Sequence, residues 1–387
     1  MINWSGQWSK INYERMEKMK KAIIEEKNRK VLTRKEMIWQ RYKKHKLGMM
    51  GGIITLILIV ISIFAPFFSP YDYKSPEYNH AYMPPQKIHF FDENGKFHLR
   101  PFVYEQKMGM DPKTWQRIFE EDTSKRYPVY FIKRSWEYEL MGFIKTDIHL
   151  FGAEKPGSIY VIGTDSIGRD ILSRIIFGSR ISIIIAACGA LLSALVGSLI
   201  GGISGYFSGK VDLFIQRIIE MFQLFPQIPL MMALSAAIPA TWPPIMVFVG
   251  VVVVLSLIQW TYLAREVRAM VLSYRDQDFV RAGKAIGCGD MYIIAKHIIP
   301  NCISHIIVVI TITIPRLILA ESTLSFLGLG IQPPMVSWGV LLSDASKIQI
   351  IGQYPWVLFP GVVIIITILA LNFFGDGVRD AFDPHSA

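Results

Sequence analysis

Residues able to perform chemistry on nucleotides, metals or acyl groups are sparse in this 387-residue chain. A phosphate-cradling loop needs Gly-Lys followed by Ser or Thr. Here Gly95-Lys96, Gly209-Lys210 and Gly283-Lys284 are followed by Phe, Val and Ala. Neither HExxH nor GxSxG occurs, the eight histidines do not cluster at ligand spacing, and the three cysteines show no CxxC pair. The sequence therefore predicts no catalytic residue, no metal site and no cofactor bound by this chain.

Two ionisable residues fall within an apolar segment, where a charge has a large free-energy cost. Arg316 and Glu321 lie inside or near the end of the apolar stretch 302–322. Such residues are expected to face the interior of a helix bundle rather than lipid. Two interpretations remain open: both line a polar path, or both are paired structurally.

The elements that position these residues are long apolar segments. Hydrophobic residues make up 51% of the chain and charged residues 19%, below the roughly 25% charge of soluble domains. A membrane-spanning helix needs about 20 mostly apolar residues, and six stretches qualify. The third is the weakest because Pro226 and Pro229 interrupt it. The prediction is an all-α integral membrane protein with spans at 47–68, 181–206, about 222–238, 245–263, 302–322 and 356–374.

The net charge of +10 is concentrated at the N-terminus. Residues 1–46 contain fourteen Lys and Arg against five Glu. A basic tail before a first span predicts a cytoplasmic N-terminus, and six spans then place the C-terminus in the cytoplasm too. The tail does not predict nucleic-acid binding. Residues 69–162 become an extracytoplasmic insertion, in which alternating apolar residues around Asn94-Gly95 predict a hairpin over 88–99.

A stripe of small residues marks the second span. Small side chains at every fourth position of a helix allow another helix to approach closely. We therefore expect a tight helix interface along this face, formed by Gly189, Ser193, Gly197, Gly201 and Gly205.

Residues 264–301 connect the fourth and fifth spans and predict a helix–turn–helix at the membrane surface. Asp278 is expected to cap a short helix that ends at Gly287. Asp290 is expected to start a second helix, which stops at Pro300. Small side chains would give the first helix a flat side that could enter a groove on a partner; they belong to Ala282, Gly283 and Ala285. The alternative is an amphipathic linker.

The segment before the second span carries a cluster of charge. Thr164 or Asp165 is expected to cap a helix beginning at Ser166. The arginines that follow are expected to anchor this helix among lipid headgroups, and the alternative is that they meet a carboxylate of a ligand; they are Arg169, Arg174 and Arg180.

Several of these motifs together resemble a known family. Arg281-Ala282-Gly283, Gly287 and His297-Ile-Ile-Pro300 resemble the coupling loop of ABC-importer permeases, with Arg281 and Gly283 departing from its Glu-Ala-Ala pattern. Three further runs resemble C-type permeases of oligopeptide and dipeptide importers. These are Gly163–Arg174 with Phe177–Ser182, Glu321–Gly330 with Pro333-Pro334 and Ser337–Gly339, and Gly375–Pro384.

The resemblance implies a six-transmembrane-helix type I ABC importer permease, with residues 163–387 as its core. It implies a multi-pass protein of the cell membrane that pairs with a second homologous permease, two cytoplasmic ATPases and an extracytoplasmic peptide-binding lipoprotein. ATP and magnesium would bind to the ATPases. Nickel or dipeptides are alternative substrates to oligopeptides, and a membrane-anchored receptor or enzyme is an alternative of a different class. The residues expected to couple to the ATPase are Asp278, Arg281, Ala282, Gly283, Gly287, Asp290, His297 and Pro300; Arg316 and Glu321 are candidates for the translocation path.

Overall fold

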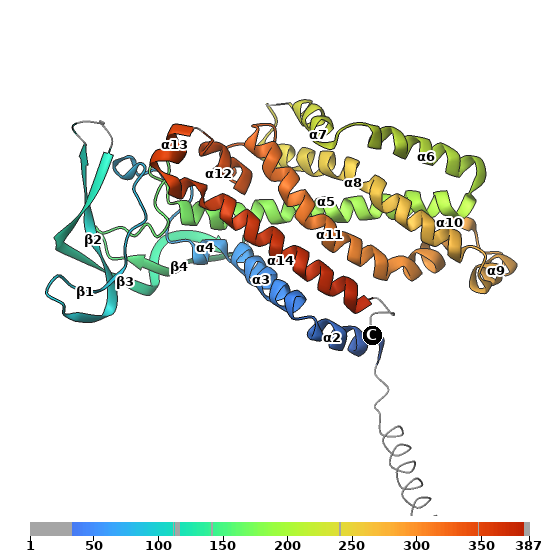
Figure 1. The fold of residues 1–387 in the computed structure, drawn as a ribbon, viewed down its shortest axis with the longest axis horizontal. Helices are drawn as coiled ribbons and strands as arrows, with labels where there is room; N and C mark the ends of the chain where they lie inside the picture. Colours follow the sequence, from blue (N-terminus) through green and yellow to red (C-terminus); the bar gives the residue numbers. More distant parts are fainter. Residues whose placement is uncertain are drawn as a thin grey trace, which may run out of the picture.

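The computed structural model describes residues 33–110, 112, 117–140, 142–239, 241–346 and 348–382. Most of the predicted basic tail therefore lies outside the described residues. The described residues form a helical bundle with a β-sheet at one end and the short helix α9 at the other (Figure 1). The described ends of the chain, in α2 (Arg34–Lys44) and α14 (Phe359–Phe382), lie on the side away from the sheet.

Five helical segments of the bundle are long and apolar enough to cross a membrane. They are α3 (Lys46–Ile63), α5 (Ile171–Phe207), α8 (Pro244–Tyr274), the segment Asp290–Phe326 that contains α11 (Ile299–Phe326), and Pro355–Phe382 that contains α14. The predicted third span is divided between α6 (Gly209–Leu224) and α7 (Gln227–Ala236), which meet at 90°. Pro226, which has no backbone N–H to continue the helix, lies at this break. Within the described residues the count is therefore five, or six if the bent pair is one span.

The core of the bundle lies where α5, α8 and α11 meet. Ile185 on α5, Leu255 on α8 and Leu317 on α11 are completely buried in one cluster. α5 lies centrally among the helices and α14 covers α3 (Figure 1). By contrast, α3 keeps many apolar side chains exposed, Leu56 and Ile57 among them, as expected for a helix that faces lipid.

The insertion is a four-stranded antiparallel sheet with strands in sequence order. It contains β1 (His89–Phe91), β2 (Phe97–Met110), β3 (Arg117–Leu140) and β4 (Ile144–Ala153). The predicted hairpin is confirmed: Phe91 pairs with Phe97, and Gly95 adopts a φ of 73° in the turn between them. The all-α description thus holds for the bundle and not for the insertion.

The sheet joins the bundle through a narrow neck. The backbone N–H of Gln86 donates to the Tyr160 carbonyl at 3.0 Å, and the Tyr160 N–H donates to Gln86 Oε1 at 2.7 Å. A second attachment comes from α4 (Ala65–Phe68), where His149 Nδ1 lies 2.9 Å from the Pro66 carbonyl oxygen. The insertion is therefore held to the bundle both where its two flanking segments pair and through β4.

The cap of α5 differs from the prediction. The helix begins at Ile171, and Asp170 Oδ2 accepts a hydrogen bond from the Ser173 N–H at 2.8 Å. Burial raises the pKa of Asp170 to about 6. Thr164, predicted as a cap, instead accepts a hydrogen bond from the Met83 N–H at 2.8 Å.

The arginines around the start of α5 are also placed differently. Arg174 is 3% exposed, and its Nη1 lies 2.5 Å from Asp165 and 3.0 Å from Asp344 at the end of α12 (Trp338–Asp344). Arg169 Nε bonds the same Asp165 at 2.7 Å. The expected headgroup location is wrong for Arg174, because two carboxylates draw its guanidinium into the protein.

The remaining short elements connect these parts. They are η1 (Tyr78–His80), α9 (Asp278–Ala285), α10 (Asp290–Ile293), the π-helical turn η2 (Ile294–Ile298), α13 (Ile348–Gln353) and η3 (Pro355–Leu358).

Candidate functional site

The helix α9 ends in a Schellman turn, a tight arrangement that satisfies the last carbonyl groups of a helix. Gly287 has a φ of 83°, its N–H donates to the Lys284 carbonyl, and the Cys288 N–H donates to the Gly283 carbonyl, both at 3.0 Å. A left-handed conformation favours glycine. The predicted termination of this helix at Gly287 is confirmed.

The inner face of α9 is anchored to the bundle. Val280 is completely buried together with Ile293 and Ile294, in a cluster that also contains residues of α5, α8 and α11. The Tyr206 hydroxyl at the end of α5 donates to Asp290 Oδ1 at 2.6 Å. Asp290 is the first residue of α10, as predicted. These contacts hold the short helix in a fixed position relative to three long helices.

The outer face of α9 is uncovered in the isolated chain. Arg281 and Ala282 are exposed, and Ile286 beyond the helix end is 79% exposed. On the neighbouring α10, Met291 and Tyr292 are about half exposed. An apolar surface of this kind next to basic residues is typical of an interaction site.

Three details of this segment differ from the prediction. Gln277, not Asp278, is the N-cap of α9, and Asp278 makes no side-chain capping bond. Gly283 is buried and faces Ile293. It lies three residues after the buried Val280, and residues three apart on a helix share a face. The flat outward side is therefore formed by Ala282 and Ala285 alone.

Pro300 does not end the second helix. It lies in the first turn of α11, where its missing N–H is tolerated, and the π-helical turn η2 precedes it. The chain continues as one helical segment from Asp290 to Phe326. His297, inside the π-helical turn, is half-buried with its ring 5.7 Å from that of Tyr292. α10 is therefore continuous with the long apolar helix α11.

The small-residue stripe on α5 lies mainly against α8. A Cβ atom added to Gly197 would lie 2.8 Å from the Trp260 carbonyl oxygen, and one on Gly205 would lie 2.8 Å from that of Arg268. A Cβ on Gly201 would meet the carbonyl oxygen of Ala264 and lie 3.0 Å from its Cα. Ser193 and Gly189 extend the stripe, with Ser193 Oγ donating to the Ser256 carbonyl at 3.3 Å and Gly189 facing Leu317.

The two ionisable residues of α11 are separated. Residues five apart on a helix point about 140° away from each other. Glu321 is completely buried, and its carboxylate accepts hydrogen bonds from Ser182 Oγ at 2.9 Å and Ser325 Oγ at 2.7 Å. Its environment is that of a structural carboxylate between α5 and α11. Arg316, by contrast, is exposed.

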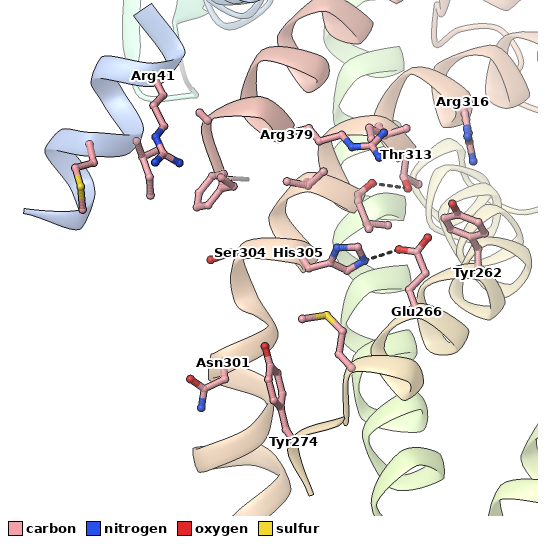
Figure 2. Close-up of a pocket in the computed structure, with 18 residues that line it drawn as sticks. Arg41, Tyr262, Glu266, Tyr274, Asn301, Ser304, His305, Thr313, Arg316 and Arg379 are labelled. Carbon is pink, nitrogen blue, oxygen red and sulfur yellow. Dashed lines mark hydrogen bonds and ion pairs between the residues drawn. The ribbon is translucent and has the colours of Figure 1, made fainter. Parts of the chain in front are cut away.

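Arg316 lines a cavity of about 800 Å³ between α2, α8, α11 and α14 (Figure 2). Its guanidinium lies 5.7 Å from the ring centre of Tyr262 on α8. One turn further along α8, Glu266 Oε2 lies 2.6 Å from His305 Nε2 on α11. The other polar residues of the wall are Arg41, Tyr274, Asn301, Ser304, Thr313 and Arg379.

Sequence reasoning missed most of this cavity. His305 lies within the predicted fifth span, and the rule that singled out Arg316 could have found it. Glu266 and Arg379 fall just outside the predicted spans, so the rule for ionisable residues inside a membrane segment does not apply to them. Their convergence depends on how α8, α11 and α14 pack.

Comparison with known proteins agrees with this architecture. Residues 195–386 match the family described as "Binding-protein-dependent transport system inner membrane component", and residues 34–85 match the "N-terminal TM domain of oligopeptide transport permease C".

Two individual relatives match over almost the whole chain, and a third matches over part of it. The dipeptide transport system permease protein DppC of Lactococcus lactis subsp. cremoris is 33% identical over 90% of this chain and 90% of its own length. The oligopeptide transport system permease protein OppC of Bacillus subtilis is 30% identical over 89% of this chain and 87% of its own. OppC of Haemophilus influenzae is 40% identical over 58% of this chain and 70% of its own. The chain therefore belongs to the oligopeptide and dipeptide ABC permeases, as a C-type membrane subunit of a peptide importer.

Proposed function

We propose that this chain forms one half of an oligopeptide translocation pathway and converts ATPase movement into alternating access. The observation that carries the proposal is α9, a short helix with a buried inner face and an uncovered outer face. A helix fixed in this way can transmit a push from a docked partner into α5, α8 and α11. The same geometry would serve dipeptide transport equally well.

The partners in this proposal are a second permease, two ATPases that dock on α9, and an extracytoplasmic receptor lipoprotein. The permease names of the relatives support such an assembly. The exposed Arg316 supports a second permease, since an uncovered guanidinium within a membrane helix is costly in lipid. The cavity wall is then the natural candidate for part of the pathway.

The proposal is tested with the assembled complex in proteoliposomes that contain ATP. Uptake of a labelled pentapeptide is measured in competition with unlabelled pentapeptide, dipeptide or Ni²⁺. We expect competition by the pentapeptide to exceed that by the dipeptide. Stronger competition by the dipeptide or by nickel would reassign the substrate, and peptide-independent ATP hydrolysis without uptake would refute the transport role.

The orientation that we propose places α9 in the cytoplasm and the sheet outside. The basic N-terminal residues support it. In a variant without native cysteines, Phe131→Cys on β3 should react with an impermeant thiol reagent in intact cells, because Phe131 is 69% exposed. Ile286→Cys, 79% exposed next to α9, should react only after permeabilisation. The reverse labelling would invert the topology.

We also propose that the sheet supports docking of the receptor. Its surface carries exposed aromatic side chains beside charges, including Phe91, Phe97 and Phe131, a mixture suited to a protein interface. Replacing residues 88–157 by a short Gly-Ser linker removes the contact of His149 with α4 but keeps the pairing of Gln86 with Tyr160, so we expect the bundle to remain folded. Stimulation of ATP hydrolysis by limiting receptor should fall severalfold. Unchanged stimulation would remove the docking role.

A further inference from the structure

The guanidinium of Arg316 has no acidic partner among the described residues. No carboxylate lies within 4.0 Å of it there, and the contact found for it is the face of Tyr262. The residues next to the arginine in α11 are apolar: Ile314, Pro315 and Leu317. A cation in this position is stable only if water or an anion reaches it.

The cavity around Arg316 is electropositive. Arginines from three different helices line it, and Glu266 is the one acidic residue on its described wall. That carboxylate is already engaged, because His305 Nε2 lies 2.6 Å away. Figure 2 shows Arg316 and Arg379 on the same side of the Glu266–His305 pair. The charge at this end of the cavity thus favours an anionic ligand.

The depth of Arg316 in the membrane distinguishes between two anions that could bind it, a phospholipid headgroup and a transported solute. The residue lies ten positions before the end of α11 at Phe326, or about 15 Å along a helix. Because the predicted span 302–322 also continues six residues beyond Arg316, the residue lies inside a hydrocarbon layer about 30 Å thick rather than at its surface. A phospholipid headgroup stays at the membrane surface, whereas a solute that crosses the bundle passes this level.

A carboxylate is the anion that every peptide with a free C-terminus carries. Arginine binds carboxylates through two parallel N–H donors, a geometry that lysine cannot reproduce. The cavity volume of about 800 Å³ falls within the range of small-ligand sites. The tyrosines of its wall, Tyr262 and Tyr274, can contact varied side chains without selecting one.

We propose that Arg316, assisted by Arg379, forms a subsite that binds the C-terminal carboxylate of the peptide during its passage. This proposal rests on the proposed transport function and specifies which chemical group of the substrate the permease recognises. Because the carboxylate is common to all peptides, the subsite would accept many sequences while requiring a free C-terminus.

The test compares a labelled pentapeptide with its C-terminal amide, each delivered by saturating receptor to the complete complex in proteoliposomes. Arg316→Gln should lower uptake of the free acid about tenfold, as expected for losing one charge-assisted hydrogen bond, and leave uptake of the amide nearly unchanged. Arg316→Lys should restore only part of the difference. Arg265→Gln is the matched control. Arg265 lies on α8 and is exposed like Arg316, but it donates a hydrogen bond to Gln223 and does not line the cavity.

The outcomes distinguish the subsite from its alternatives. Equal loss of both peptides, or no loss of either, would overturn the subsite while leaving the transport function intact. Loss of a copurifying anionic phospholipid in Arg316→Gln, with the acid-to-amide ratio unchanged, would assign the site to lipid and overturn the peptide assignment. If the wild-type complex transports neither peptide, the proposed function fails, and the subsite fails with it.

Discussion

Replacing Gly201 by leucine should strongly destabilise the folded chain in the membrane. The position is in direct contact with the backbone of Ala264 on α8, and even a Cβ would lie 3.0 Å from the Ala264 Cα. A backbone cannot rotate away as a side chain can, so α5 and α8 would have to separate. Overpacking of this kind costs about 3 kcal/mol at the upper end of its usual range, a large part of a typical folding free energy.

The loss of stability should differ from one position of the small-residue stripe to another. Gly189→Ala should be mild, because the atom nearest to the new Cβ is the flexible end of Leu317 at 3.2 Å. Cys188→Leu is the matched control for added bulk, since Cys188 is exposed on the same helix. The measurements are the amount of protein in the membrane and the detergent-solubilised melting temperature. Normal values for Gly201→Leu would show that α5 and α8 do not pack as described.

Ala282→Asp should uncouple ATP hydrolysis from transport without affecting the fold. Ala282 is exposed on α9 in the isolated chain, and substitutions at exposed positions usually change stability by less than about 0.5 kcal/mol. If an ATPase covers this face, the new carboxylate is buried without a partner, which is costly. We expect at least a tenfold loss of ATPase copurification or of transport, at normal expression.

Gly287→Val tests the same contact through the backbone. No atom lies within 4 Å of the added Cβ, so the cost arises from the φ of 83° alone, about 1–2 kcal/mol for a side-chain-bearing residue. The strain should be relieved by displacing α9, and transport should fall. Gly287→Asn, which tolerates this conformation better, should retain activity.

Gly289→Ala is the matched control for the coupling segment. Gly289 has a φ of −67° and no atom near its added Cβ, so alanine fits without strain. Transport and ATPase copurification should match the wild type. Wild-type transport in both Ala282→Asp and Gly287→Val would mean that α9 is a solvent-exposed linker, and the coupling proposal would be abandoned.

Features that depend on local sequence could be predicted from it. The turn at Gly287 follows from a glycine at the end of a short helical segment, and the hairpin at Asn94-Gly95 follows from a dipeptide typical of tight turns. The small-residue spacing on α5 likewise identified the face that lies against α8. In each case the information lies within a few turns of one element.

Features that depend on distant residues could not be predicted. Arg174 is buried because Asp344, 170 positions away, approaches it. The cavity gathers side chains from four helices, so no single segment contains its pattern. The prediction that Pro300 ends a helix is wrong for a different reason. A proline can either end a helix or occupy its first turn, and the π-helical turn that precedes Pro300 has no sequence signature of its own.

The neck formed by Gln86 and Tyr160 has a consequence for the length of the insertion. These residues are 74 positions apart in the sequence but share two hydrogen bonds. The two segments that enter the bundle are therefore held together independently of the residues between them. The entropy of closing a loop grows only slowly with its length. A sheet that is longer or shorter between these two residues is therefore compatible with the same pairing at the neck.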